Sequence, residues 1–243
     1  MVEKKAGEKK KQAILKVSKE LFYEKGYKET TFTDISKILD CPASTISYHF
    51  GSKIELASII QGEYSRQNKV YIESMVGDVY SKTMLMALEI LNMWKRNLEN
   101  DKLHRFLIET GADSSIVTSY FDYIKYLYKI VIDEHNIEVS NDKLSLMAAT
   151  QIGMTHEILV IASTDLVSLD YFGYASHVIT VFCKMIGFSE YKISKLIENA
   201  AEIFKKLPID NRYFDYFSYS KKYIHKIDKS KLPPENLSIW EER

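Results

Sequence analysis

The sequence predicts an all-α protein, with a small N-terminal head of three helices, a long connecting helix and a larger helical body. Two observations predict this class. Apolar residues recur at three- and four-residue spacing in nearly every segment after residue 8, as is typical of helices with one buried face. In addition, no segment alternates apolar and polar residues for long enough to indicate a β-strand. We therefore expect helices only.

The first helix of the head is expected from Glu8 to Lys25. Gly26 follows it and is expected to end it, because glycine readily adopts the left-handed backbone found after helix ends. Residues at helical spacing form the buried face of this helix: Ile14, Val17, Ser18, Leu21 and Phe22.

Two short helices are expected next. Thr31 is followed three residues later by Asp34, a pattern that predicts an N-terminal cap for a helix beginning near Phe32. Asp40 is expected in the turn, since aspartate tolerates the left-handed backbone, and Pro42 is expected to begin the second short helix. The first short helix is expected to turn three residues inward: Ile35, Ile38 and Leu39.

The second short helix has a core face and an open face. Ile46 and Phe50 lie four residues apart and are expected to face the core. Small or polar residues occupy the other positions: Ala43, Ser44, Thr45, Ser47, Tyr48 and His49. Such side chains suit a helix that enters the major groove of DNA. Ser52 and Glu55 predict a capping box that begins a third helix at Lys53, so the segment has the layout of a helix-turn-helix.

These residues resemble the TetR-like family of helix-turn-helix transcriptional regulators over about the first quarter of the chain. The matching positions, with no insertion, are Ile14, Leu15, Leu21, Phe22, Gly26, Tyr27, Thr30, Thr31, Asp34, Ile35, Thr45, Ile46, Tyr48, His49, Phe50, Ser52, Lys53 and Leu56. The chain departs from the family pattern where Asp40 replaces the turn glycine, Pro42 a serine cap, and Ser44 a second glycine. Ser47 replaces an aromatic residue that contacts DNA phosphates in the family.

The resemblance implies a dimeric transcriptional regulator, expected to be a repressor, that a small-molecule effector releases from a double-stranded DNA operator. The alternative is a DNA-binding structural or protein-partner module of the same family without an effector. A cavity in the body would favour the first function, and a filled body the second. An all-α enzyme has no residues to support it, because the sequence contains no metal-ligand spacing and no phosphate-binding loop. We therefore expect no metal and no cofactor.

The DNA-binding surface is expected on and around the second short helix. Residues 1–60 contain 11 Lys and 8 Asp or Glu, a net charge of +3 in a chain whose formal net charge is zero. The N-terminal lysines form either a solvated tail or a contact with phosphates. Because the second short helix has no Arg or Lys, phosphate contacts by Lys53 and residues 9–11 are expected to supply most of the affinity. The predicted DNA-binding residues are Lys11, Thr31, Thr33, Ala43, Ser44, Thr45, Ser47, Tyr48, His49 and Lys53.

Beyond the head, apolar spacing predicts further helices separated by Gly, Asn or Asp. They are expected at Ile54–Val76, Lys82–Leu98, Lys102–Thr110, Ser114–His135, Asn141–Ser163, Tyr171–Ile186 and Tyr191–Leu207. After Pro208 we expect one aromatic-rich helix over Asn211–Ile227 and, from Lys229, a poorly ordered tail. The expected domains are residues 1–56 for DNA binding, 57–207 for effector binding and dimerisation, and 208–243 for the C-terminal helix and tail.

Two body helices favour the association of two chains. Residues Leu144 to Ile161 are apolar nearly all round, and such a helix must be covered on all sides. The last strong helix has a broad apolar stripe: Ile193, Leu196, Ile197, Ala200, Phe204 and Leu207. Pairing both helices with their copies predicts a homodimer with a four-helix interface. A single-chain bundle is the alternative.

The resemblance implies an effector pocket lined by the middle helices of the body. The candidate effector-binding residues are Met86, Trp94, His104, Leu107, Tyr123, Tyr126, Leu127, Met154 and His156. The alternative for each is a place in the ordinary core, which Met and aromatic residues at helical spacing usually fill. His156 and Glu157 are adjacent and point about 100° apart on a helix, so at most one of them is expected to face a cavity.

The cysteines and the apolar segments favour a cytoplasmic protein. Cys41 and Cys183 are the two cysteines and lie far apart in the chain, which excludes a disulfide framework. With no secretory signal at the N-terminus, a reducing cytoplasm is expected. The most membrane-like segment, Tyr171 to Phe188, contains His177 and Lys184. We interpret it as a buried helix and expect no membrane partner.

Overall fold

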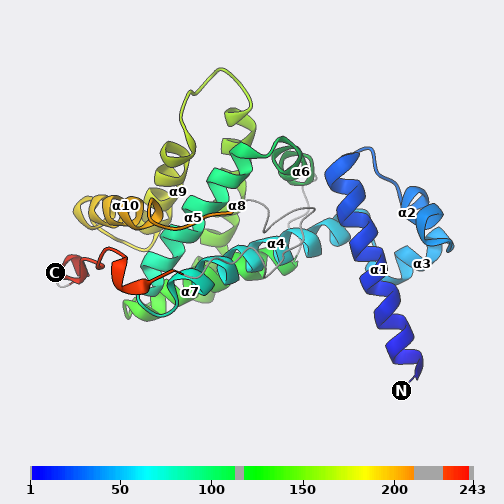
Figure 1. Ribbon diagram of the computed structural model, residues 1–243, viewed down its shortest axis with the longest axis horizontal. Coiled ribbons are helices and arrows are strands. Elements are labelled where there is room, and N and C mark those ends of the chain that lie inside the picture. Colours follow the sequence, from blue (N-terminus) through cyan, green and yellow to red (C-terminus); the bar gives the residue numbers. More distant parts are fainter. Residues whose placement is uncertain (1, 113–117, 211–226, 241–243) are drawn as a thin grey trace.

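The computed structural model describes residues 2–112, 118–210 and 227–240, and every regular element in these ranges is a helix. A head of α1 to α3 lies at one end, α4 runs from it along the body, and α5 to α10 build the body (Figure 1). The expected all-α class with a helical head is confirmed. The elements are α1 Val2–Glu24, α2 Phe32–Leu39, α3 Ala43–Phe50, α4 Lys53–Val76, α5 Lys82–Glu99, α6 Asp101–Gly111, α7 Thr118–Glu134, α8 Asn141–Ala162, α9 Tyr171–Met185, α10 Glu190–Phe204, η3 Lys229–Lys231 and η4 Leu237–Trp240.

Most helix bounds agree with expectation to within one residue. The first helix is longer than expected, because it begins at Val2 rather than Glu8. Lys11 and its neighbours therefore belong to a helix and not to a tail. α10 ends at Phe204, three residues before the expected end. The expected start of α7 at Ser114 lies outside the described residues.

The inward faces of the three head helices form its core. Leu21 and Leu39 are only half-buried against this core. The expectation for Ile38 is wrong, since its side chain is 59% exposed. α2 is eight residues long and contacts α1 and α3, so its covered face is narrower than the i, i+3, i+4 pattern suggests. The expected inward residues that are buried are Ile14, Val17, Ser18, Phe22, Ile35, Ile46 and Phe50.

The caps and the turn predicted for the head are present. Thr31 Oγ1 accepts a hydrogen bond from Asp34 N (3.2 Å), and Asp34 Oδ2 accepts one from Thr31 N (2.8 Å). Ser52 and Glu55 form the same reciprocal pair at the start of α4. Asp40 follows α2 with a left-handed φ of 45°. The starts of α2 and α4 are thus determined by neighbouring residues.

The head docks on α6 of the body. The rings of Phe22 and Phe106 stack with their centroids 6.0 Å apart. Arg105 donates from Nη2 to the carbonyl oxygens of Tyr23 (2.7 Å) and Glu24 (3.2 Å). A cation of α6 therefore binds the last carbonyl groups of α1, where it also complements the negative end of the helix dipole.

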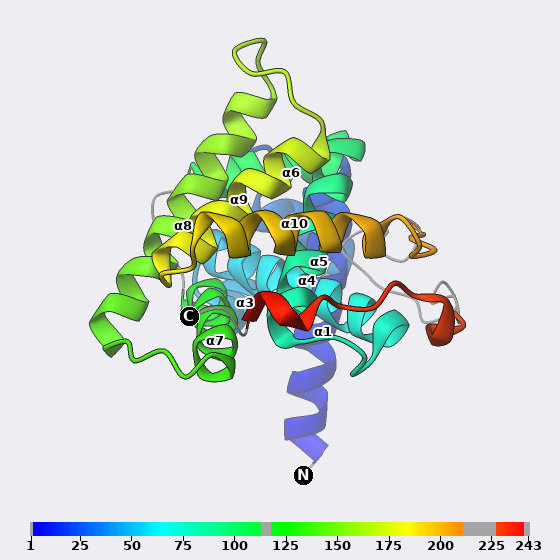
Figure 2. The ribbon, with the colours of Figure 1, turned by 90° about the vertical axis from the view of Figure 1, so that its left-hand side faces the viewer.

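α5 is the central helix of the body and contacts α4, α6, α7, α9 and α10. α9 buries most of its apolar side chains, as expected. α10 crosses the end of the body away from the head (Figure 2). Its apolar stripe packs on α5 and α9, and Leu196 and Ala200 are fully buried within this one chain. The expectation that this stripe pairs with a second subunit is therefore wrong, because α5 and α9 already cover it.

The expectation of a poorly ordered C-terminal tail is wrong for residues 229–240. This segment contains η3 and η4 and lies against the body (Figure 2). Glu235 accepts hydrogen bonds from Ser81 N (2.6 Å) and Ser81 Oγ (2.5 Å), and Tyr80 Oη donates to the carbonyl of Pro233 (2.8 Å). Contacts of single residues like these leave no periodic pattern in a sequence. The expected aromatic helix lies, apart from Ile227, outside the described residues.

Candidate DNA-binding surface and body cavity

α3 presents an open face made of residues expected to contact DNA. Ile46 and Phe50 anchor the helix in the head, while Tyr48 is 86% exposed. Ser44 and Ser47 are exposed beside it. The remaining candidates on this helix are half-buried: Ala43, Thr45 and His49. A helix with a slender, polar outer face at one end of the molecule has the shape that entry into a DNA groove requires.

Three further candidates are exposed on α1 and α2. Lys11 lies on α1, and Thr31 and Thr33 lie at the start of α2. Thr31 Oγ1 also donates to Asp34 Oδ2 (2.8 Å). The Lys25 ammonium, 2.8 Å from the same oxygen, and the Thr31 groups hold the pKa of Asp34 far below its usual range. A permanent carboxylate therefore stabilises the positive N-terminal end of α2.

Lys53, the last candidate, is engaged within the head. Its Nζ donates to the carbonyl oxygens of Tyr27 (3.0 Å), Thr30 (3.1 Å) and Lys28 (3.3 Å). The same ammonium lies 4.4 Å from the centroid of the Tyr27 ring. These contacts use the three donors of the ammonium group to join α4 to the turn between α1 and α2. Contact between Lys53 and DNA phosphate stays a prediction, and its structural role has no signal in the sequence.

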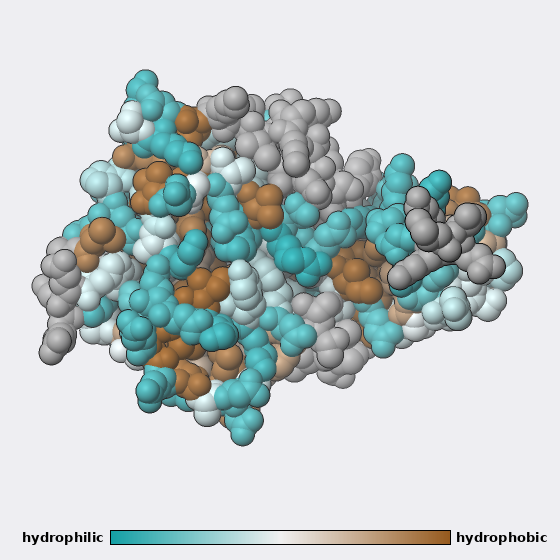
Figure 3. Space-filling model, turned by 90° about the horizontal axis from the view of Figure 1, so that it is seen from below, coloured by the Kyte–Doolittle hydropathy of each residue, from teal (hydrophilic) through white to brown (hydrophobic). Residues whose placement is uncertain are grey.

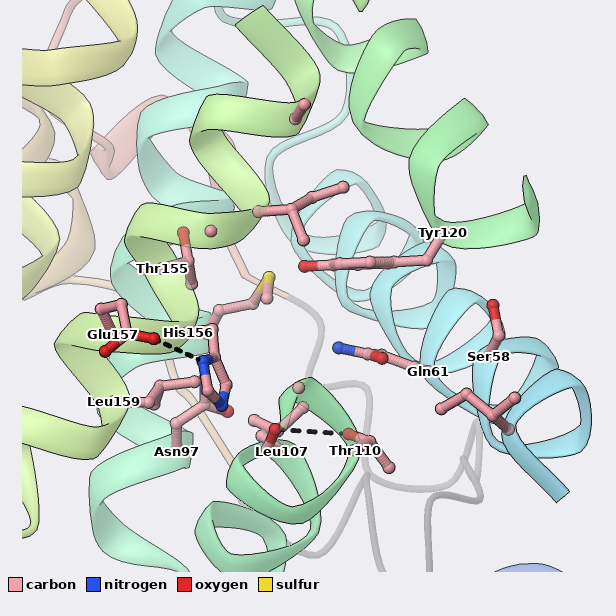
Figure 4. A pocket seen from close by; sticks show the side chains of 16 residues that line it. Ser58, Gln61, Asn97, Leu107, Thr110, Tyr120, Thr155, His156, Glu157 and Leu159 are labelled. Atoms are coloured by element: carbon pink, nitrogen blue, oxygen red, sulfur yellow. Dashed lines mark hydrogen bonds and ion pairs between the residues drawn. The ribbon is translucent and has the colours of Figure 1, made fainter. Parts of the chain in front are cut away.

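A cavity of about 260 Å³ opens between α4, α5, α6, α7 and α8 (Figure 4). Gln61 of α4 and Tyr120 of α7 point into it from one side, and His156 of α8 lies opposite. Leu107 and Thr110 of α6 also line it. Because α6 both lines this cavity and contacts the head, a ligand held here would touch the helix on which the head rests.

A smaller chamber of about 50 Å³ adjoins the cavity. Both spaces share Met93, Tyr120 and Thr155 as wall residues. The chamber is mostly apolar, but Ser65 lies in its wall with 1% of its surface exposed. The Ser65 hydroxyl has no hydrogen-bond partner, so one polar atom of this chamber is open to a ligand.

The structure places six of the predicted effector-binding residues around these spaces. The larger cavity is lined by Leu107 and His156, and the chamber by Met86, Trp94, Tyr123 and Leu127. The other three lie elsewhere. Tyr126 is 51% exposed, His104 has both ring nitrogens within hydrogen-bond distance of backbone carbonyls, and Met154 lines neither space. Five polar residues of the cavity wall are absent from the predicted set: Ser58, Gln61, Asn97, Tyr120 and Thr155. Isolated polar positions on otherwise apolar helix faces are the sequence signal that indicates them.

His156 and Glu157 both line the cavity, so the expectation that at most one does is wrong. His156 Nδ1 lies 3.2 Å from Glu157 Oε1, and Nε2 lies 3.2 Å from the carbonyl oxygen of Ile108. The long side chain of Glu157 reaches its neighbour despite the 100° between their Cα–Cβ directions. Gly111 allows the imidazole this close to α6, because a Cβ atom there would collide with the ring.

Comparison with known proteins identifies the head. Residues 14–58, which run from α1 into the start of α4, match the family model described as bacterial regulatory proteins, tetR family. No curated protein matches the chain. Within the part of the chain that the structure describes, no three His, Cys, Asp or Glu side chains are grouped to hold a metal ion.

Three solved structures match the chain at low sequence identity. A crystal structure of a gamma-butyrolactone receptor (ArpA-like protein) has 15% sequence identity and a TM-score of 0.44, and covers 83% of this chain and 98% of that chain. A second such structure has 15% identity and a TM-score of 0.35, with coverages of 74% and 97%. A mutant of HlyIIR has 17% identity and a TM-score of 0.29, with coverages of 72% and 97%. The N-terminal head, matched from α1 into the start of α4, is therefore similar to the helix-turn-helix region of the tetR family of bacterial regulatory proteins.

Proposed function

We propose that this protein is a dimeric, cytoplasmic repressor that binds an operator through its head and is released by a small-molecule effector held in the body. The observation that carries the proposal is the position of α6, which lines the 260 Å³ cavity and also contacts the head. In this role the chain catalyses no reaction and needs no cofactor.

In the proposed DNA complex the N-terminal part of α3 lies deepest in the major groove. Ala43 and Thr45 then meet thymine methyl groups, and Ser44 donates to or accepts from a base edge. Tyr48, the most exposed large side chain of α3, lies beside them. Because α3 contains no Arg or Lys, phosphate contacts supply most of the affinity, and the exposed Lys11 is the clearest candidate for one.

A gel-shift assay with DNA from upstream of the gene tests the head. Tyr48→Ala should weaken binding about fivefold or more, since a good base contact contributes about 1–3 kcal/mol. Tyr191→Ala is the matched control, because Tyr191 is also exposed but lies on α10, at the far end of the body. If both variants bind like the wild type, α3 does not enter the groove.

The proposed dimer interface is on α8. The most apolar stretch of this helix is only 22% buried, and Leu146 is 69% exposed. Apolar side chains also reach the surface of the body in several groups separated by hydrophilic ones (Figure 3). We choose a second copy as the partner that covers α8, because a helix-turn-helix protein recognises two half-sites as a two-fold dimer.

Sedimentation at micromolar concentration tests the dimer. Leu146→Glu should give monomers, whereas Leu237→Glu, at an exposed leucine of η4, should leave the dimer intact. By length and composition alone α8 could also cross a membrane. A monomeric wild type that binds phospholipid vesicles would therefore replace a dimer by a membrane surface as the partner of α8.

The effector would act through α6. Besides the Arg105 contacts, Glu109 of α6 accepts a hydrogen bond from Lys28 N (3.0 Å) at the turn after α1. A ligand that binds more tightly when α6 is in one position shifts α6, and with it the head, toward that position. A ligand with equal affinity for both positions would shift nothing. The cavity supports this function over the alternative of a DNA-binding module without an effector.

A further inference from the structure

We propose that the ligand of the body is an uncharged amphipathic molecule, with its hydrogen-bonding end in the larger cavity and a hydrocarbon or aromatic end in the smaller chamber. This inference rests on the proposed function, because it specifies the effector of the same site. Three properties of the walls support it: their shape, their charge and their open hydrogen-bonding groups.

The shape of the site favours a molecule with two different ends. The cavity of about 260 Å³ and the chamber of about 50 Å³ adjoin at Met93, Tyr120 and Thr155, so one ligand can occupy both. The chamber buries apolar side chains, among them Met86 and Trp94. Each methylene group transferred from water into such a chamber should raise affinity about fourfold.

The charge of the walls excludes most ionised ligands. Among the described residues, no Lys or Arg lines either space. A carboxylate or phosphate would therefore lose its hydration without meeting a lysine or arginine. Both ring nitrogens of His156 already face Glu157 Oε1 and the carbonyl oxygen of Ile108. Glu157 is the acidic wall residue, and its side chain is 72% exposed. Such an exposed carboxylate attracts a ligand cation only weakly, which leaves a neutral ligand as the best fit.

The open hydrogen-bonding groups favour a ligand that accepts hydrogen bonds. The Gln61 amide and the Tyr120 hydroxyl point into the cavity (Figure 4) and make no hydrogen bond to the described part of the chain. Burial raises the pKa of Tyr120 to about 12, so its hydroxyl stays neutral and can donate. Asn97 accepts from Tyr64 Oη through Oδ1 (3.2 Å), which leaves its N–H groups for the cavity. Hydroxyl, carbonyl and ether oxygens suit these donors.

Three probes with one common tail test the ligand class: 4-pentylphenol, 4-pentylbenzoate and protonated 4-pentylbenzylamine. Calorimetry with the full chain and no DNA should show the phenol binding at least tenfold more tightly than either ion. In a series from 4-methylphenol to 4-hexylphenol, affinity should rise about fourfold per methylene and then level off when the chamber is full. Tighter binding of either ion, no dependence on tail length, or no binding of any phenol would each overturn the proposal.

Two variants separate the two ends of the site. Gln61→Leu keeps the size of the side chain but removes the amide, so it should weaken phenol binding roughly fivefold and leave the dependence on tail length unchanged. Thr155→Phe, at the junction of the two spaces, should abolish the dependence on tail length. Gln12→Leu, at an exposed glutamine of α1, should change neither. If Thr155→Phe does not fold, Gln61→Leu and the probe series still decide the question.

The same probes distinguish the ligand class from the effector role. Binding without DNA depends on the ligand class alone. If 4-pentylphenol binds as expected but leaves the affinity for operator DNA unchanged, the ligand class stands and the proposed release from DNA fails. If it changes DNA affinity only in the wild type and not in Gln61→Leu at the same concentration, both stand.

Discussion

The helices that begin in the head and α5 of the body are capped in different ways. In the head, α2 and α4 start with capping boxes whose partners lie three residues apart. In the body, the first turn of α5 is bound by two carboxylates that are distant in sequence. Glu134 comes from the end of α7. Glu235 comes from the C-terminal segment, 154 residues after Ser81, to which it is hydrogen-bonded. Local chemistry therefore determines the starts of α2 and α4, whereas the start of α5 also depends on contacts between segments that are distant in sequence.

The start of α5 shows how complete this distant capping is. The Glu134 carboxylate accepts hydrogen bonds from Lys82 N (2.7 Å) and Thr83 N (2.8 Å), and that of Glu235 from the N–H of Ser81. The Ser81 hydroxyl accepts a hydrogen bond from Met84 N (3.0 Å). All four N–H groups that a helix leaves open at its start are satisfied. The C-terminal segment thus completes a helix that lies far earlier in the chain.

The contact shared by head and body should be the most sensitive to mutation. Phe106 of α6 is fully buried against Phe22 of α1. Phe106→Ala should lower the free energy of unfolding by about 3–5 kcal/mol, because it leaves a cavity at this contact. Urea unfolding measures this, and Phe121→Ala, at a half-buried position of α7, should cost much less. A loss below about 1 kcal/mol for Phe106→Ala would show that the head does not depend on α6.

The head could be largely predicted from the sequence because its determinants are local. The capping boxes that begin at Thr31 and Ser52, and the left-handed turn at Asp40, each involve residues within one or two helical turns. Such short-range patterns can be read directly. The prediction that Ile38 is buried is wrong for a different reason. The spacing of apolar residues shows which side chains share a side of α2, but not how far the neighbouring helices extend over it.

The body could be predicted as helices but not as contacts. The stripe of α10 indicates a buried face, yet no periodicity shows whether the same chain or a second one covers it. Glu235 forms no pattern with Ser81, because 154 residues separate them. Gln61 and Tyr120 of the cavity are equally compatible with a surface position when only the sequence is known. These features depend on how distant segments come together in space.

Loss of the Glu134 cap at the start of α5 should have the next largest effect on the free energy of unfolding. Glu134→Ala removes hydrogen bonds from Lys82 N, Thr83 N and Thr83 Oγ1. Since hydrogen bonds to a charged group contribute about 1.5–3 kcal/mol, thermal unfolding should show a loss in that range. Glu134→Gln keeps one acceptor oxygen and should lose about half as much. Glu138→Ala, at an exposed position nearby, is the control. Equal losses for Glu134→Ala and Glu138→Ala would contradict the role of the distant cap.

A titratable group buried in the body should make its stability depend on pH. Glu89 of α5 is 4% exposed, with Lys69 Nζ 3.4 Å from its Oε1. Burial outweighs this lysine and raises the pKa of Glu89 from 4.5 to about 7. Between these pH values the folded chain holds a proton that the unfolded chain has released. The stability that Glu89 contributes is therefore fully present below about pH 4.5 and is lost as the pH rises through about 7.

Glu89→Gln isolates this effect from all other titrations. The amide keeps the shape of the protonated carboxyl group but cannot ionise. Urea unfolding at pH 5, 6, 7 and 8 should show the stability of the wild type falling relative to that of Glu89→Gln as the pH rises. Parallel profiles for the two proteins would mean that Glu89 titrates alike in the folded and the unfolded chain.

The smallest expected effect on the free energy of unfolding concerns the local cap at the start of α4. Ser52 Oγ accepts from Glu55 N (3.2 Å), and Glu55 Oε2 accepts from Ser52 N (3.1 Å). Ser52→Ala should cost about 1 kcal/mol in the whole protein. Ser189→Ala is the matched variant, because Ser189 accepts from Lys192 N (3.3 Å) at the start of α10 without a reciprocal partner.

A peptide of residues 50–76 then shows whether the Ser52 cap needs the rest of the fold. A local cap should work there too, so Ser52→Ala should lower the helix content of this peptide in circular dichroism. A peptide of residues 79–99 contains neither Glu134 nor Glu235, and its helix start therefore lacks both distant carboxylates. If Ser52→Ala destabilises the protein but leaves the peptide unchanged, α4 also depends on distant contacts, and the difference between the starts of α4 and α5 disappears.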